Sequence, residues 1–179
     1  MKACDDTRVM VRPSLDDFTA PVLPRGYRLE RLTHHAFAEW VGGLRGFALS
    51  HRQAHAERLQ ESPVPFHGFA LLDPHARAVV CGQIALEAEL IGVYEVFTAE
   101  DRRNAGLARL LCAQMLEIAG GLGAKTGYLQ VDADELPARR VYRDAWVFRR
   151  LRVPLSVARI DRSSADAATP RDTFVPAGA

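Results

Sequence analysis

The order of patterns along this chain of 179 residues predicts an α/β fold. Strand-like and helix-like stretches follow one another as strand, two helices, three strands, helix, strand, helix and final strands. The most informative stretch, residues 93–111, reads as a strand, a loop of small residues and an amphipathic helix. Apolar residues make up 48% of the sequence and charged residues 25%, so we expect one domain with a sizeable core.

The first elements follow a stretch that has no clear period. Residues 1–26 contain three prolines and are expected to form an irregular N-terminal arm. Residues 27–32 alternate between apolar and polar side chains and predict the first strand. Thr33 is expected to cap a helix over 34–44, and Ser50 is expected to cap a second helix.

A hairpin, a long strand and a helix are predicted next. Apolar runs at 69–72 and 79–86 flank the turn signal Asp73-Pro74-His75, and residues 90–98 predict the following strand. Glycines at 120, 121 and 123 are expected to end the helix after the loop. Its apolar face is expected to comprise Leu107, Leu110, Leu111, Met115 and Ile118.

The C-terminal part is predicted to add a strand, a helix and the last strands. Residues 128–131 suit a pleated surface, and Pro137 suits the first turn of a helix because its missing N–H would be unpaired there anyway. Phe148 and residues 153–160 are expected to form final strands. The Ser, Ala, Asp and Pro composition of residues 161–179 predicts a flexible tail.

The loop before the central helix predicts a binding site for an anion. Gly106 and Ala108 lie two apart at the start of the helix, shortly after Arg103. Such a turn leaves several backbone N–H groups unpaired, with no large side chain in front of them. The first turn of a helix also carries partial positive charge. Together these features predict a site for a diphosphate.

This segment resembles the acetyl-CoA-binding motif of the GNAT (GCN5-related N-acetyltransferase) superfamily. The family pattern is Gln/Arg-x-x-Gly-x-Gly/Ala, to which Arg103, Gly106 and Ala108 correspond. Residues 129–142 resemble the family's strand, splayed loop and tyrosine-bearing helix, with Tyr142 in register. Ala138 also corresponds to that second motif.

The resemblance extends from about residue 27 to residue 157. It implies the GNAT fold: a mixed, mostly antiparallel central sheet with splayed parallel central strands and helices on both faces. It places an acetyltransferase domain at 27–160, between the arm at 1–26 and the tail at 161–179.

The resemblance implies an enzyme that moves an acetyl group from acetyl-CoA, used as co-substrate, to an amine of a small molecule or peptide. We expect direct attack in a ternary complex, because no cysteine lies near the loop as an acyl carrier. Backbone groups of Val96 and Thr98 would pair with the pantetheine arm, and the N–H near Val96 or Phe97 would stabilise the oxyanion. The residues expected to bind the cofactor are Val96, Phe97, Thr98, Arg103, Asn104, Ala105, Gly106, Leu107, Ala108, Arg109 and Glu135.

Two residues are candidates for proton transfer. Tyr142 is the candidate general acid, because a phenol with a pKa of about 10 can protonate a thiolate whose thiol has a pKa of about 8.5. Glu95 is the candidate base for the amine, directly or through water. Ideal alternation would place Glu95 on the opposite face of the strand from Tyr94 and Val96, so a solvent-facing or helix-facing role stays open.

Two positions depart from the family pattern. Glu135 replaces an asparagine near the pantetheine arm, so like charge would weaken cofactor binding unless the side chain points away. Trp146 replaces a glycine that serves a tight bend. These departures keep a second interpretation open, a non-catalytic module that binds or senses acetyl-CoA. Arginines between positions 139 and 152 form a basic cluster, interpreted as solvated surface or as a contact for the 3′-phosphate of CoA.

Composition excludes several other classes. The net charge of +1 gives no bulk attraction to nucleic acid or to an anionic membrane, so neither partner is expected. No apolar run is long enough to span a membrane, and no secretory signal is recognised, which favours a cytoplasmic location. A homodimer stays open, because the family often dimerises.

The cysteine and histidine patterns predict no metal site. Cys4, Cys81 and Cys112 lack metal-ligand spacing, and the latter two are expected to be buried and reduced. His51 and His55 lie four apart on a predicted helix, a spacing that can hold zinc. With no third ligand in view, we interpret them as a surface pair.

Overall fold

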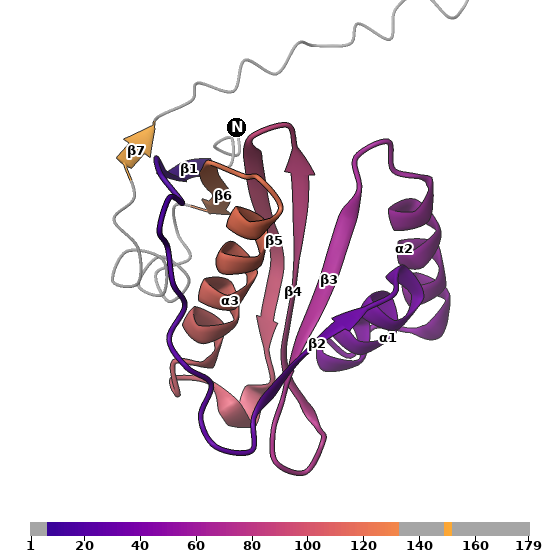
Figure 1. The fold of residues 1–179 in the computed structure, drawn as a ribbon. Helices are drawn as coiled ribbons and strands as arrows, with labels where there is room; N and C mark the ends of the chain where they lie inside the picture. The colour runs from indigo at the N-terminus through magenta and orange to yellow at the C-terminus, as the bar shows by residue number, and fades with distance from the viewer. Residues whose placement is uncertain (1–6, 133–148, 152–179) are drawn as a thin grey trace, which may run out of the picture.

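The computed structural model describes residues 7–132 and 149–151 and forms a mixed sheet flanked by helices (Figure 1). The strands are β1 (Thr7–Arg12), β2 (Arg28–Leu32), β3 (Phe66–Leu72), β4 (Ala78–Glu87), β5 (Leu90–Thr98), β6 (Thr126–Asp132) and β7 (Arg149–Leu151). The helices are α1 (His34–Leu44), α2 (Leu49–Glu61), α3 (Leu107–Gly121) and the short 3-10 helix η1 (Glu100–Arg102).

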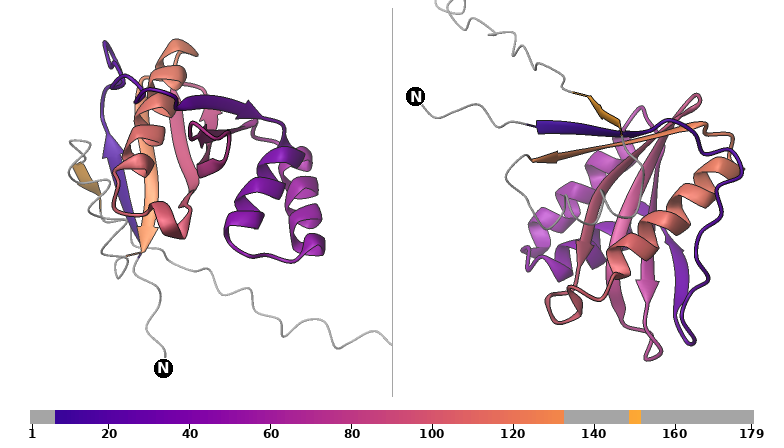
Figure 2. Two further views of the ribbon diagram at one scale, coloured as in Figure 1. Left: turned by 90° about the horizontal axis from the view of Figure 1, so that it is seen from below. Right: turned by 90° about the vertical axis from the view of Figure 1, so that its left-hand side faces the viewer.

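The seven strands lie in the order β2-β3-β4-β5-β6-β1-β7. Every neighbouring pair is antiparallel except β5 and β6, which run parallel because α3 connects them. Helix α3 covers one face of the sheet, and α1 and α2 cover the other (Figure 2). The predicted fold class, a mixed and mostly antiparallel sheet with helices on both faces, is therefore confirmed.

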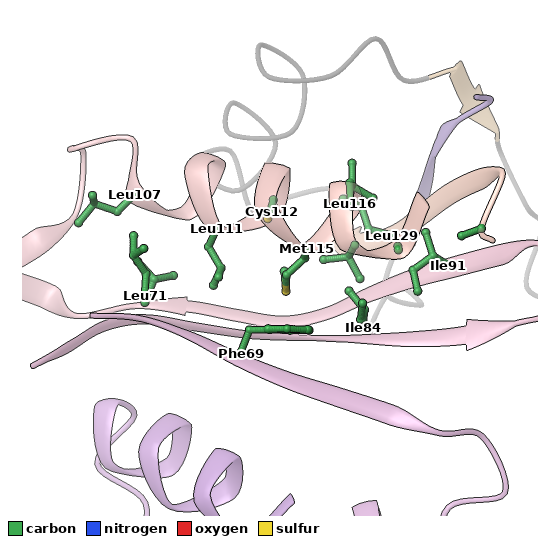
Figure 3. Packing of buried hydrophobic residues seen from close by; sticks show 14 of the residues in the cluster. Phe69, Leu71, Ile84, Ile91, Leu107, Leu111, Cys112, Met115, Leu116 and Leu129 are labelled. Atoms are coloured by element: carbon green, nitrogen blue, oxygen red, sulfur yellow. The ribbon is translucent and has the colours of Figure 1, made fainter. Parts of the chain in front are cut away.

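The larger core lies between α3 and the sheet (Figure 3). Leu111, Met115 and Leu116 are fully buried, whereas Leu110 and Ile118 of the predicted apolar face are only partly buried. Cys112 is buried beside them, so the face is rotated slightly from the predicted one. This packing fixes the start of α3, and with it the loop that precedes the helix.

The smaller core lies under α1 and α2, on the opposite face. The hydroxyl oxygen of Thr33 accepts a hydrogen bond from the amide of Ala36 at 3.2 Å, so the predicted cap of α1 is confirmed. The predicted cap of α2 is wrong: its N-cap is Ala48, and Ser50 lies inside the helix. The helix therefore begins at Leu49, and no side chain makes a capping hydrogen bond at this end.

A methyl group at Gly68 of β3 should destabilise the fold. A Cβ there would lie 2.8 Å from ring atoms of Phe37, which is 1% exposed and cannot move aside. Gly68→Ala is therefore expected to lower the free energy of unfolding by about 1–3 kcal/mol in urea titrations. The matched control is Gly121→Ala, where nothing lies within 4 Å of the new Cβ. It should be neutral or stabilising by less than about 1 kcal/mol, and equal losses in both variants would contradict the account.

The N-terminal segment is not an irregular arm throughout, so that expectation is wrong for residues 7–12. They form β1, which pairs with β6 on one side and β7 on the other. The chain then crosses the end of α3, where Leu15 is 4% exposed and its amide donates to the carbonyl of Lys125 at 2.8 Å. Residues outside the expected domain boundary thus complete the sheet and part of the larger core.

The two parallel strands separate partway along their length. Strands β5 and β6 pair from Leu90 with Thr126 to Val93 with Leu129, and no pair follows. From Tyr94 onward, β5 therefore has no partner on its β6 side among the described residues. This is the predicted splay of the central parallel strands.

Some predicted elements lie outside the described residues: the helix starting at Pro137, most of the final strands and the tail. The described strand β7, Arg149–Leu151, lies between the two stretches predicted as final strands, Phe148 and 153–160. Within the described part of the chain, no helix is both long and apolar enough to cross a membrane.

Candidate active site

A β-bulge interrupts β5 where the parallel strands separate. Gln83 pairs with Tyr94 and Cys81 pairs with Phe97, so Gly82 of β4 faces two residues of β5. Those two residues are Glu95 and Val96, and Glu95 has a φ of 50°. A left-handed backbone at a residue other than glycine costs about 1–3 kcal/mol and concentrates at functional sites.

The bulge places Tyr94 and Glu95 on the same face of the sheet, so the expected alternation is wrong here. Tyr94 packs edge-on against Phe66 on the α1–α2 face, with ring centroids 5.7 Å apart. Glu95 also reaches that face, where it contacts α2. The Val96 side chain points to the opposite face, which α3 covers. A Cβ built at Gly82 would lie 3.3 Å from the Val96 side chain, and it would also contact side chains of α3. The extra residue resets the alternation.

Glu95 lies at the centre of a polar cluster. Its Oε2 accepts a hydrogen bond from Gln83 Nε2 at 2.9 Å and lies 3.1 Å from His55 Nε2. The His55 side chain is 14% exposed and the Glu95 side chain 31% exposed. The interpretation of His51 and His55 as a surface pair is therefore wrong for His55, whereas His51 is exposed. No group of three metal-ligating side chains occurs among the described residues.

Sequence reasoning missed Gln83 and His55. Gln83 is 3% exposed, and its Oε1 is buried without a hydrogen-bond donor in the described part of the chain. An unsatisfied buried acceptor costs about 1–3 kcal/mol, whereas the Nε2 of the same amide donates to Glu95. The available signal was a single polar residue inside the otherwise apolar run of β4. Nothing local marked His55 as its neighbour.

A tyrosine pair lies at the point of separation. The hydroxyls of Tyr94 and Tyr128 are 2.6 Å apart, and the Tyr94 ring lies over Gly92, where a Cβ would come within 2.5 Å of it. Burial and the bond to Tyr128 raise the pKa of Tyr94 well above its ordinary value. Tyr94 is therefore a neutral hydrogen-bonding group at pH 7, on the same face of the sheet as Glu95.

The predicted anion loop follows β5 and η1. Asn104 has a φ of 62° and Gly106 a φ of 74°, and Gly106 is the N-cap of α3 with no side-chain cap. The first bond across the helix start runs from the amide of Leu110 to the carbonyl of Gly106. For residues 104–109, no amide hydrogen bond to another described residue is present outside the helix. These amides are open, whereas the amide of Arg103, which was also expected to be open, donates to the carbonyl of Glu100 at 3.4 Å.

Positive charge lies close to this loop. The guanidinium carbons of Arg45 and Arg103 lie 5.2 and 5.6 Å from the centroid of the Phe97 ring. Arg45 is the C-cap residue of α1. Sequence reasoning missed this cation, because it lies far from the loop along the chain. Within the described residues, neither side chain makes an ion pair with a carboxylate. The two guanidinium groups at Phe97, near the end of β5, therefore favour an anion there.

A charged network holds η1 and so supports the loop. Asp73 is buried, accepts the amides of His75 and Arg77, and pairs with Arg102 of η1 at 3.2 Å. Arg77 makes a two-bond contact with Asp101, at 2.7 and 2.8 Å. Burial acts to raise the pKa of Asp73, but the two amides and Arg102 outweigh it and hold the pKa below its ordinary value. The hydrogen bond from Arg77 lowers the pKa of Asp101.

This network should contribute stability that depends on pH. A carboxylate with a depressed pKa stabilises the fold above its unfolded-state pKa of about 3.9, and the effect is lost as pH falls through the lower folded-state value. Asp73→Asn is therefore expected to lower Tm by a few degrees at pH 7, with a difference that shrinks below about pH 3.9. Calorimetric scans of both proteins check this. The control is Glu61→Gln at an exposed site, whose Tm should equal that of the wild type at every pH. A Tm difference for Asp73→Asn that stays constant with pH would contradict the prediction.

The structure brings most of the predicted site residues to one end of β5. Glu95, Val96, Phe97 and Thr98 lie on the separated part of the strand, and residues 103–109 follow directly. Tyr142 and Glu135 lie outside the described residues, as do Ala138 and Trp146. Cys81 and Cys112 are buried as expected, and burial raises the pKa of each thiol to about 12.

The sequence matches the family model described as "Acetyltransferase (GNAT) family" over residues 27–145. No curated protein matches the chain. A GCN5-related N-acetyltransferase from Sphaerobacter thermophilus is similar with a TM-score of 0.61 and 18% identity, over 82% of this chain and 49% of that chain.

Two further solved structures are similar. A tandem GNAT protein from the clavulanic acid biosynthesis pathway has a TM-score of 0.65 and 14% identity, over 80% of this chain and 50% of that one. An aminoglycoside acetyltransferase from an uncultured soil metagenomic sample has a TM-score of 0.55 and 20% identity, over 73% of this chain and 99% of that chain. The chain spans about half the length of several structures that it matches. At these identities the likeness shows the fold.

Proposed function

Because the chain belongs to the acetyltransferase (GNAT) family, whose members transfer acyl groups, we propose that it moves an acetyl group from acetyl-CoA to an amine acceptor. The amine attacks the thioester directly in a ternary complex. Cys81 and Cys112 support this order, because burial raises both pKa values to about 12 and leaves neither thiol suited to carry the acyl group. The acceptor is a small molecule or a peptide.

The loop at the start of α3 carries this proposal. The amides of residues 104–109 have no acceptor outside the helix among the described residues, and Gly106 presents them in a left-handed turn. They bind the diphosphate of CoA, and the helix terminus contributes about 0.3–1 kcal/mol per charge. Ala108 leaves room for the phosphates, and Arg103 and Arg109 add positive charge.

The separated part of β5 receives the pantetheine arm. Backbone groups of Val96 and Thr98 pair with its amides in place of the missing β6 partner. The N–H of Val96 or Phe97, beside the bulge, donates to the oxyanion as it forms. One such donor contributes about 2.7–4 kcal/mol in other enzymes.

Proton transfer completes the reaction. An alkylamine with a pKa of about 10.4 is mostly protonated at pH 7, which costs about 4.6 kcal/mol before attack. Glu95 accepts that proton, because the bulge directs it to the face on which His55 and Gln83 hold it. Tyr142 protonates the leaving thiolate.

Thiol release from acetyl-CoA over a panel of amines tests the proposal. Catalysis predicts that free thiol appears only with both substrates present, and that acetyl-CoA raises Tm. The alternative is a module that binds or senses acetyl-CoA without chemistry, and it predicts the same rise in Tm with no thiol release for any amine. The second result would reject the enzyme.

A further inference from the structure

One arginine at the end of α1 is partly shielded from water and has no anionic partner among the described residues. The guanidinium carbon of Arg45 lies 5.2 Å from the centroid of the Phe97 ring and 5.8 Å from that of Phe47. Its Nε is buried without a hydrogen-bond acceptor, while the residue as a whole is partly exposed. A partly desolvated cation of this kind is stabilised by an anion that reaches its exposed edge.

The segment that carries Arg45 has a defined conformation. The amide of Phe47 donates to the carbonyl of Gly42 at 2.8 Å. Arg52 of α2 donates from its Nε to the carbonyl of Phe47 at 2.8 Å, and its Nη1 lies 3.4 Å from Oε2 of Glu39. The nearby carboxylate of Glu39 is therefore paired with Arg52, whereas the charge of Arg45 stays uncompensated within the described part of the chain.

Arg45 reaches Phe97 from the face of the sheet that is proposed to receive the acceptor. Phe97 packs against the smaller core under α1 and α2, and Glu95, the proposed base, contacts α2 on the same face. Helix α3, whose first amides are proposed to bind the diphosphate, covers the opposite face (Figure 2). Arg103 approaches the Phe97 ring from the loop before α3 and belongs with those amides. An anion at Arg45 is therefore better supplied by the acceptor than by CoA.

The chemistry of Arg45 indicates which anion it would bind. A guanidinium can make two parallel N–H···O bonds to one carboxylate. Phe97 follows Glu95 by two positions on β5, and extended backbone rises about 3.3 Å per residue, so these positions are no more than about 7 Å apart. An acceptor whose amine lies at Glu95 and whose carboxylate lies at Arg45 would meet opposite charge at both ends.

We propose that Arg45 is a specificity-determining residue that binds a carboxylate of the acceptor. The preferred acceptor is then a zwitterion whose primary amine and carboxylate are several bonds apart. This inference rests on the proposed acetyl transfer and adds no step to it, because the carboxylate stays bound to Arg45 while the amine attacks the thioester.

Two matched acceptors provide the first test. With acetyl-CoA at saturation, 6-aminohexanoate and 6-aminohexanamide are compared by thiol release at pH 7. They share the primary amine and the chain length and differ in the charge at the other end. The carboxylate should be preferred by at least about 10-fold in kcat/KM. Equal values, or a preference for the amide, would overturn the inference while leaving acetyl transfer intact.

Variants of Arg45 assign this preference to one side chain. In Arg45→Gln the charge is lost, so the KM for 6-aminohexanoate should rise about 10-fold or more and the preference over the amide should fall to about twofold or less. Arg45→Lys keeps the charge without the two parallel bonds, so its preference should be intermediate. The control is Arg58→Gln, at an exposed site on α2, which should keep the wild-type preference.

Three results of the variant series would each overturn the inference. A wild-type preference in Arg45→Gln would show that the carboxylate is bound elsewhere. Equal losses with 6-aminohexanoate and with its amide, in both Arg45 variants, would show a packing role. A rise in the KM for acetyl-CoA with the acceptor preference unchanged would assign Arg45 to the phosphates of CoA.

A binding measurement makes the inference independent of turnover. Each of the two compounds is titrated into the wild-type chain saturated with CoA, and backbone amide NMR shifts are followed at residues 45, 47 and 97. Saturable shifts with 6-aminohexanoate that are much weaker with the amide support the site even if no acceptor releases thiol, a result that would reject only the proposed function. Equal shifts with both compounds, or none with either, would reject the carboxylate site whatever the activity.

Discussion

Ala108→Trp is expected to abolish measurable binding of acetyl-CoA while the fold stays intact. Ala108 lies in the first turn of α3, where it is partly buried at the edge of the larger core beside the open amides of the loop, so an unchanged Tm of the variant is the check on its fold. An indole there would occupy the volume that the diphosphate needs. We expect a loss of at least about 100-fold in affinity by calorimetry, which corresponds to about 2.7 kcal/mol.

The matched control is Gly121→Trp, at the far end of the same helix. Gly121 is exposed and a Cβ there meets nothing within 4 Å, so we expect a bulky side chain to extend into solvent, away from the proposed site. Its affinity for acetyl-CoA should equal that of the wild type. Wild-type affinity in Ala108→Trp would show that the diphosphate does not approach this turn, and the proposed binding mode would be wrong.

Tyr142→Phe should reduce turnover strongly and leave binding unchanged. The residue was identified from the second motif, and it lies outside the described part of the chain. Removing a general acid slows proton transfer to the thiolate by about 100- to 10,000-fold, whereas the KM for acetyl-CoA should stay within a factor of two. Steady-state kinetics of thiol release measure both quantities.

Tyr27→Phe provides the comparison, because Tyr27 packs partly buried against the larger core, far along the chain from β5. It should keep wild-type turnover. Full activity in Tyr142→Phe would remove that residue from the mechanism. A Tyr142→Phe variant that loses acetyl-CoA binding and turnover together would instead show that the residue supports the cofactor.

The parts of the site that could be predicted are set by neighbours in sequence. Strand β5 has the predicted bounds, Leu90–Thr98, because its apolar pattern and the turn before it are local. The loop was predicted because the small residues Gly106 and Ala108 stand at the start of a helix, where the first backbone amides have no partner within the helix. Such features depend on residues that are close together in the sequence, so they can be predicted from a single sequence.

The parts that could not be predicted depend on distant residues. The bulge at Glu95 arises from pairing with Gly82 of β4, and no pattern within β5 marks the extra residue. His55 reaches Glu95 only because α2 packs on that face of the sheet. Strand β1 was missed because its partner, β6, follows far along the chain and nearby prolines suggested irregular structure.

The central claim is that the amides of residues 104–109 bind the diphosphate of CoA. It is tested most directly by following the backbone amide NMR signals of the full chain during titration with CoA. The account predicts saturable shifts that are largest at residues 104–109 and at the separated end of β5. Binding that leaves these amides unshifted, or no binding at millimolar CoA, would contradict it.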